Sequence, residues 1–269
     1  MNGTRAVWDL SLAGTVKPEK GGISINMEQR RDLKIMGSSR AGGGVYEKVS
    51  IMGDGSVHGD VDCSQFSCAG SAHIEGSVKA GEMKIRGTSQ VNGNVNANKL
   101  SIQGQGEIRG SLRAGEANIG GMANIGRNLQ GDRLSLKGSA TVQGDCEFES
   151  ITANGSLQVE GLLNASSLDL RLQWPCRARE IGGDTIKIRR GSGLGNLLGF
   201  LPGLFHTEPD ARMSADLIEG DHIELEHTTA RIVRGNDVVI GPGCDIGQVE
   251  YRRQLHRHPD CTVHHIIQL

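Results

Sequence analysis

Apolar residues in the middle of the chain recur at every seventeenth position, from Val49 through Phe66 to Leu168, without a slip. Within each repeat, apolar and polar residues alternate, which is the period of a β-strand. The runs are too short, and too rich in glycine and β-branched residues, to be helices. Because a fixed period defines the architecture, the pattern predicts a repeat protein built from short strands.

Aligning the repeats produces columns of like residues. The first apolar column contains Val49, Phe66, Met83, Leu100, Ala117, Leu134, Ile151 and Leu168. The glycine column contains Gly53, Gly70, Gly87, Gly104, Gly121, Gly138 and Gly155. Since glycine adopts positive φ without a Cβ clash, this column predicts a corner in every repeat. Each repeat is then one coil of three short strands and three turns, and successive coils stack about 4.8 Å apart in a parallel β-solenoid.

The regular coils extend toward the N-terminus. An earlier coil containing Leu33, Ile35 and Gly37 fits the pattern if one residue is deleted. We therefore predict a regular β-helix over residues 33–172. The polar segment 1–32 is predicted to be an N-terminal tail or cap.

A different rhythm follows the regular coils. The motif that begins at Ile181, apolar-x-Gly-x2-apolar-x-apolar, recurs at Ile218 and again, after a 15-residue interval, at Val233. Residues 173–269 are therefore predicted to form shorter, irregular β-solenoid coils. An apolar insertion over residues 191–212 separates the first two of these motifs.

The composition narrows the functional classes. A formal net charge of −2 argues against nucleic acid as the main partner, which would need a basic stripe. Six cysteines at irregular spacing do not predict a disulfide framework, and those in apolar columns are interpreted as buried thiols. The sequence shows no signal peptide and no apolar stretch of ~18 residues, so a cytoplasmic protein is expected.

The 17-residue coil, apolar-x-apolar-x-Gly-x3-apolar-x-Gly-x-apolar, resembles that of the bactofilin family of bacterial polymer-forming cytoskeletal proteins. The resemblance covers about residues 33–170. It implies a right-handed three-sided β-helix, end-to-end polymerisation into nonpolar filaments without nucleotide, and scaffolding of envelope-associated machinery. The chain departs from the family pattern after residue 170, where typical members have only a short tail.

The ends of the solenoid are the first candidates for a functional surface. A terminal coil leaves backbone groups unpaired and an apolar cross-section uncovered, which invites another chain. We expect self-association into a homo-oligomer or filament through Leu33 and Ile35. The alternative is a monomeric or small-oligomer adaptor, in which the regular coils form a rigid rod and the C-terminal half binds a partner or a membrane.

The apolar insertion is the second candidate surface. Its large apolar residues are Leu197, Leu198, Phe200, Leu201, Leu204 and Phe205. Exposed apolar loops mark contacts with proteins or membranes, and a segment this short can lie on a bilayer but cannot span it. Two interpretations are open: packing of the insertion against the side or end of the solenoid, or contact with a membrane surface or a partner such as an envelope protein.

No catalytic residue or cofactor is predicted. The nearest enzyme class, the hexapeptide-repeat acyltransferases, has 18-residue coils and a catalytic histidine, whereas His58 and His73 are predicted to point outward without an acidic partner. The C-terminal residues of zinc-ligand type are His256, His258, Cys261, His264 and His265. Their spacing matches no recognised finger, so we predict a histidine-rich strand and no metal site.

Overall fold

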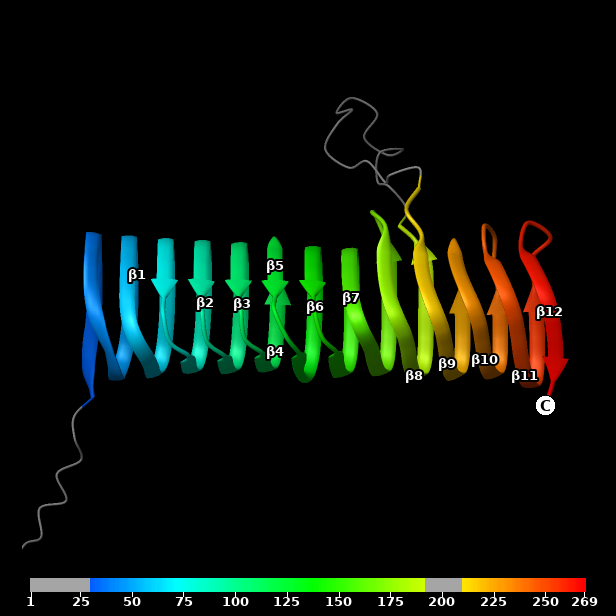
Figure 1. The fold of residues 1–269 in the computed structure, drawn as a ribbon, viewed down its shortest axis with the longest axis horizontal. Coiled ribbons are helices and arrows are strands. Elements are labelled where there is room, and N and C mark those ends of the chain that lie inside the picture. The colour runs from blue at the N-terminus through cyan, green and yellow to red at the C-terminus, as the bar shows by residue number, and fades with distance from the viewer. Residues whose placement is uncertain (1–29, 192–209) are drawn as a thin grey trace, which may run out of the picture.

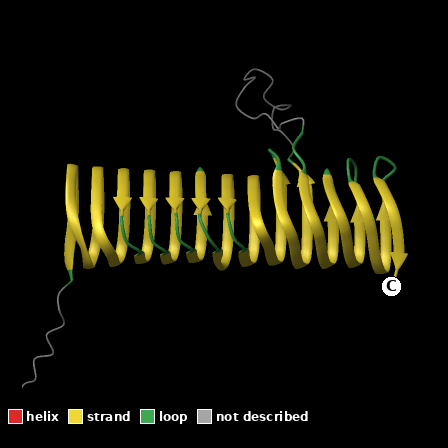
Figure 2. Cartoon of the chain, viewed as in Figure 1, coloured by secondary structure: helices red, strands yellow, loops and turns green. Residues whose placement is uncertain are grey.

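The protein is a β-solenoid in the computed structural model, which describes residues 30–191 and 210–269. Within these residues no helix is present, and strands make up nearly the whole chain (Figure 2). The coils stack along one axis into a straight rod, with β1 at one end and β12 at the other (Figure 1). The predicted parallel β-solenoid is therefore confirmed.

Twelve strands form one sheet in the described part of the chain. They are β1 (Arg31–Ile74), β2 (Val78–Val91), β3 (Val95–Ile108), β4 (Leu112–Ile119), β5 (Met122–Ile125), β6 (Leu129–Val142), β7 (Cys146–Leu172), β8 (Cys176–Arg190), β9 (Met213–Leu225), β10 (Thr228–Ile240), β11 (Asp245–Arg257) and β12 (Thr262–Gln268). Neighbours in the sheet follow the chain order, except that the short β5 pairs with β3 and β6. All pairings between these strands, for example β1 with β2 and β11 with β12, are parallel.

The repeat period becomes the register of the sheet. Val61 pairs with Val78, Val78 with Val95, and Val95 with Leu112, so each residue lies beside its equivalent in the next coil. The inward side chains form continuous apolar ladders, and these four residues are at most 1% exposed. Stacking is what makes such coils stable, because one coil alone buries too few side chains to offset the entropy of ordering it.

The corners differ from the prediction of three separate short strands. Single strands run through them, as in β2, which continues from Val78 to Val91. Gly87 in this strand has φ +136°, and a Cβ built there would lie 2.2 Å from the carbonyl oxygen of Gly70 in the preceding coil. Glycine is therefore required both for the bend and for the close stacking of coils. Between β4 and β5 the strand is interrupted at Gly120 and Gly121.

A polar column that the sequence analysis overlooked also joins the coils. Its members are Asp60, Ser77, Asn94, Ser111, Asn128 and Asp145. In five of these six residues, all except Ser111, the side-chain oxygen accepts a hydrogen bond from a backbone N–H of the next coil. Asp60 Oδ1 accepts from Ser77 N at 2.7 Å, and Asn94 Oδ1 accepts from Ser111 N at 2.8 Å. The last bond of the series runs from Leu162 N to Asp145 Oδ1 at 2.8 Å. The column thus fixes the register of the regular coils.

Coil length varies after β7. Leu168 pairs with Ile186, so this coil is one position longer than the regular coils. The predicted 15-residue spacing is found between β9 and β10, where Val233 pairs with Ile218. Between β11 and β12 the regular spacing returns, at the pair Val249 and Ile266. The irregular coils are therefore confirmed, and the same sheet continues through them. The division of the chain at residue 172 stays a proposal.

Candidate self-association surfaces at the ends of the solenoid

Exposed apolar side chains gather at the two ends of the rod. In the described residues, the large apolar side chains that are exposed are Met36, Val45, Met52, Met122, Trp174, Val239, Ile266, Ile267 and Leu269. The first three lie on the first two coils and the last three on the last coil. Since scattered single apolar residues are normal on a protein surface, it is their concentration at the ends that makes these regions candidate interaction surfaces.

The N-terminal end is formed by the first coil of β1. Gly37 stacks on Gly53, as shown by the 2.7 Å that would separate a Cβ on Gly53 from the Gly37 carbonyl oxygen. These two glycines are one residue closer in sequence than the stacked glycines of the regular coils. The predicted one-residue deletion in this coil is therefore confirmed. Ile35 is 3% exposed, and Leu33 is partly buried against the same core. In the described chain no strand lies on the outer side of this coil. The role of Leu33 and Ile35 in self-association stays a prediction.

The C-terminal end is formed by β12, which pairs only with β11 among the described strands. Ile266 pairs with Val249 and continues an inward column that is fully buried at Val233 and Val249. Ile266 itself is 44% exposed, because none of the described strands stacks on its outer side. A histidine-rich strand was predicted here, but Ile266 was not singled out, although it lies one regular period after Val249.

The second predicted surface cannot be compared with the structure. Leu197, Leu198, Phe200, Leu201, Leu204 and Phe205 lie outside the described residues. Trp174, in the turn between β7 and β8, is 42% exposed. No helix able to cross a membrane is found in residues 30–191 and 210–269. The contact of the insertion with a membrane or partner is therefore carried forward as a proposal.

Two of the C-terminal histidines pair with carboxylates. His264 Nε2 lies 3.2 Å from Asp245 Oδ1, and His258 Nδ1 lies 3.7 Å from Asp260 Oδ2. Nowhere in the described ranges do three His, Cys, Asp or Glu side chains come together in an arrangement suited to a metal ion. The described structure therefore brings together no ligand set from the residues of zinc-ligand type.

The cysteines are core residues. Cys63, Cys68, Cys146, Cys176 and Cys244 are buried, and Cys261 is partly buried. Desolvation raises the pKa of Cys63 to about 11 and that of Cys146 to about 12, with a further contribution from Asp62 and Glu147 respectively. These thiols stay protonated at neutral pH, so they are not nucleophiles. The prediction of buried reduced thiols is confirmed for these residues.

The prediction that His58 has no acidic partner is wrong. His58 Nδ1 lies 2.8 Å from Glu75 Oε2, because the repeat register places Glu75 in the same outward column of the next coil. His73 Nδ1 lies 3.1 Å from Gln90 Oε1 in the corresponding way. Both side chains of the His58–Glu75 pair are 48% exposed, and such surface pairs contribute little free energy. The pair is a consequence of stacking.

Known proteins resemble both the coil pattern and the whole chain. Residues 18–113 match the bactofilin family, which is described as polymer-forming and cytoskeletal. The uncharacterized protein YhbE of Bacillus subtilis is 58% identical over 238 residues, which cover 88% of this chain and 98% of that protein. The chain belongs to the bactofilin family. The uncharacterized protein YhbF of the same organism is 36% identical over 104 residues, 38% of this chain and 40% of that protein.

The bactofilin match and the structure agree where they overlap. The matched residues include the first coil and continue into β4, while the coils themselves continue beyond the match to β12. No solved structure matches the chain. The bactofilin assignment identifies the protein as a member of a polymer-forming cytoskeletal family, and it confirms the resemblance seen in the sequence.

Proposed function

We propose that the protein is a non-enzymatic cytoskeletal scaffold of the bacterial cytoplasm that assembles end to end without nucleotide and organises envelope-associated processes. The observation that carries this proposal is the placement of apolar surface. Val45 is 59% exposed on the first coil and Ile266 is 44% exposed on the last. Each lies at an end of the sheet, where the outermost strand has an unpaired edge among the described residues.

The physical basis for end-to-end assembly is that the terminal coil of a second copy resembles the coils already stacked in the rod. A second copy that docks on an end extends the ladder of backbone hydrogen bonds and covers the apolar cross-section. Burying a side chain of the size of Ile266 contributes about 1.5–3 kcal/mol. Because this free energy comes from the contact itself, assembly needs no nucleotide. The partners are then other copies of the chain, with a membrane surface or envelope proteins at the insertion that contains Leu197 to Phe205.

Negative-stain electron microscopy of the purified protein tests this proposal, over a series of salt and protein concentrations and without nucleotide. We expect filaments or sheets at micromolar protein. Uniform short rods under all conditions would contradict end-to-end assembly. That result would favour the adaptor alternative, in which the C-terminal half binds a partner.

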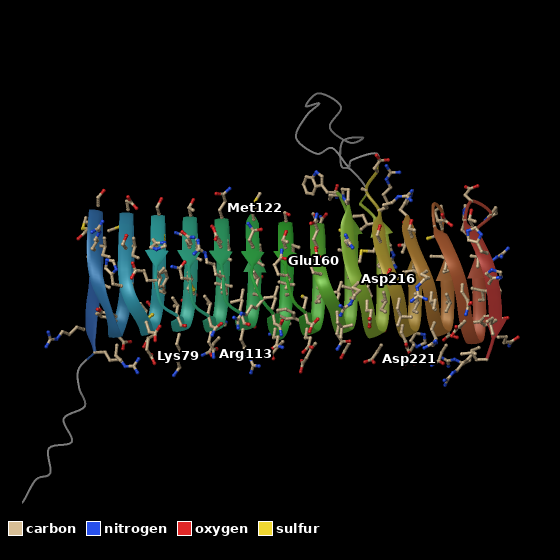
Figure 3. The ribbon with its side chains drawn as sticks, in the orientation of Figure 1. Lys79, Arg113, Met122, Glu160, Asp216 and Asp221 are labelled. Carbon is tan, nitrogen blue, oxygen red and sulfur yellow. The ribbon has the colours of Figure 1, made fainter. Side chains whose placement is uncertain are left out.

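Charge substitutions locate the contacts. Val45→Lys and Ile266→Lys place a charge on the first and last coils at positions that are already exposed, so both variants are expected to fold. Each should reduce the sedimenting fraction strongly if its end forms a contact. The matched control is Met122→Lys, because Met122 is 45% exposed and lies midway along the rod (Figure 3). Equal sedimentation of all three variants would contradict assembly through the ends.

A further inference from the structure

One inward column of the solenoid ends in a charged residue. The column runs through Leu170, Ile188, Leu225 and Ile240, each at most 1% exposed and each paired with the next. Arg257 pairs with Ile240 and occupies the same column in the last coil. Its side chain is exposed. An arginine therefore stands where these earlier coils have an aliphatic side chain.

The surroundings of Arg257 show that this is the C-terminal edge of the column. The backbone N–H of His258 donates to the Ile240 carbonyl oxygen at 2.8 Å, so the coil stays stacked up to Arg257. Two residues earlier, Leu255 pairs with Val238 and packs against the core. Arg257 forms no salt bridge with any described residue, in contrast to Arg253, whose guanidinium lies 2.7 Å from Asp237. The column thus ends in an unpaired positive charge on β11, which lies with β12 at the right-hand end of the rod in Figure 1.

Such a charge opposes pairing at the edge. Natural β-proteins use inward-pointing charged residues to keep exposed edges from joining other chains. A copy that stacks on this coil has to bury the guanidinium without a partner, and burial of an unpaired charge is strongly unfavourable. This holds for both orientations of the incoming copy. Its first coil would place Ile35 against Arg257, and its last coil would bring up a second positive charge.

We infer that Arg257 opposes the pairing of a second copy with the C-terminal edge and thereby sets the protein concentration at which that copy joins. This inference rests on the proposed end-to-end assembly. The apolar residues of the same end, such as Ile266, favour the contact, and Arg257 opposes it. These opposing contributions prevent non-specific pairing of the edge with other chains but still allow assembly with a second copy.

The test compares Arg257→Leu with the wild-type protein in a sedimentation series over protein concentration. Leucine restores the aliphatic column, so we expect the threshold for assembly to fall about tenfold or more. Arg257→Lys keeps the charge and should leave the threshold near that of the wild type. Arg252→Leu is the matched control, because Arg252 lies exposed in the same strand, outside the column. Circular dichroism checks that all variants are folded.

The outcomes separate this inference from the proposed function. A lower assembly threshold for Arg257→Leu alone supports the inference that Arg257 opposes assembly. An equal fall for Arg257→Leu and Arg252→Leu would assign the effect to general hydrophobicity and overturn it. If the wild type assembles and Arg257→Leu has the same threshold, the role of Arg257 is overturned while end-to-end assembly stands. If neither protein assembles, both proposals fail.

Discussion

The regular coils before Leu172 and the irregular coils after it belong to one sheet, but they are held together differently. In the regular coils, glycine corners and the polar column connect each coil to the next through the backbone, as in the bond from Ser111 N to Asn94 Oδ1. These connections repeat because each coil has the same length. The polar column ends at Leu162, at the point where the register shifts between Val159 and Leu162.

Ion pairs join coils in both halves, as between Arg133 and Glu116 in the regular coils, and they continue where the coil length varies and the polar column is absent. Arg234 bridges two neighbouring coils, with Glu250 at 2.6 Å and Glu219 at 3.3 Å. Arg189 lies 2.7 Å from Glu224 across β8 and β9. Long side chains adapt to a register that changes by one or two positions, whereas a short side chain bonded to a backbone N–H does not. The comparison shows that a constant coil length is what permits a backbone-directed ladder.

The largest expected loss of stability comes from a substitution at a glycine corner of the regular coils. Gly104 has φ +141°, and a Cβ there would lie 2.2 Å from the Gly87 carbonyl oxygen. We expect Gly104→Ala to lower the free energy of unfolding by about 2–4 kcal/mol, since it combines backbone strain with overlap between coils. Denaturant unfolding followed by circular dichroism measures this loss.

The matched control lies in the irregular half. A Cβ on Gly182 would meet the flexible Asn164 side chain at 3.0 Å, and Gly182 has no positive φ. Gly182→Ala should therefore change the free energy of unfolding by less than about 1 kcal/mol. A similar loss for both substitutions would contradict a difference between the two kinds of coil.

The repeat made most of the fold predictable, and the exceptions have physical reasons. A constant period fixes the strand type, the parallel register and the inward columns, so residues such as Leu100 were placed correctly. The polar column was overlooked because Asp60 and Asn94 differ in chemistry and share only the ability to accept a hydrogen bond. Coil lengths after β7 were less predictable, since bulges there shift the register without changing the local pattern.

The candidate surface was predictable in kind and only partly in detail. Unpaired ends follow from any solenoid, and Leu33 and Ile35 were found because they keep the apolar spacing. Ile266 was missed because the coil before it departs from that spacing. At the same end Arg257 stands in a different inward column, where the preceding coils have aliphatic side chains such as Ile240. Only the register of the sheet shows that Arg257 replaces an aliphatic residue.

An intermediate effect is expected from the polar column. Asn94→Ala removes the acceptor for Ser111 N and should cost about 1 kcal/mol of unfolding free energy. Asn94→Asp keeps the acceptor and should cost less. Asn96→Ala is the control, because Asn96 is exposed two residues further on and accepts no such bond. Thermal unfolding of the three variants tests the predicted order of their stabilities. An equal loss for Asn94→Ala and Asn96→Ala would show that the polar column does not stabilise the regular coils.

The smallest expected effect comes from an ion pair of the irregular half. A hydrogen bond from Arg189 holds the pKa of Glu224 below its ordinary value of 4.5. Because the folded-state pKa is lowered, the stabilisation is present above the ordinary value and is lost as the pH falls through the lowered one. Both side chains are more than 40% exposed, so screening by solvent limits the contribution of the pair to about 0.5 kcal/mol.

Glu224→Gln should therefore be slightly less stable than the wild type at pH 7 and low salt. The difference should shrink at a salt concentration of about 1 M and disappear as the pH falls through the lowered pKa of Glu224, because the carboxylate is then protonated. Asn94→Ala is the contrasting variant, since a bond to a neutral amide depends little on salt. Unfolding curves at two pH values and two salt concentrations make the comparison. If Glu224→Gln and Asn94→Ala respond equally to salt, the irregular coils do not depend on charge in the way that their ion pairs indicate.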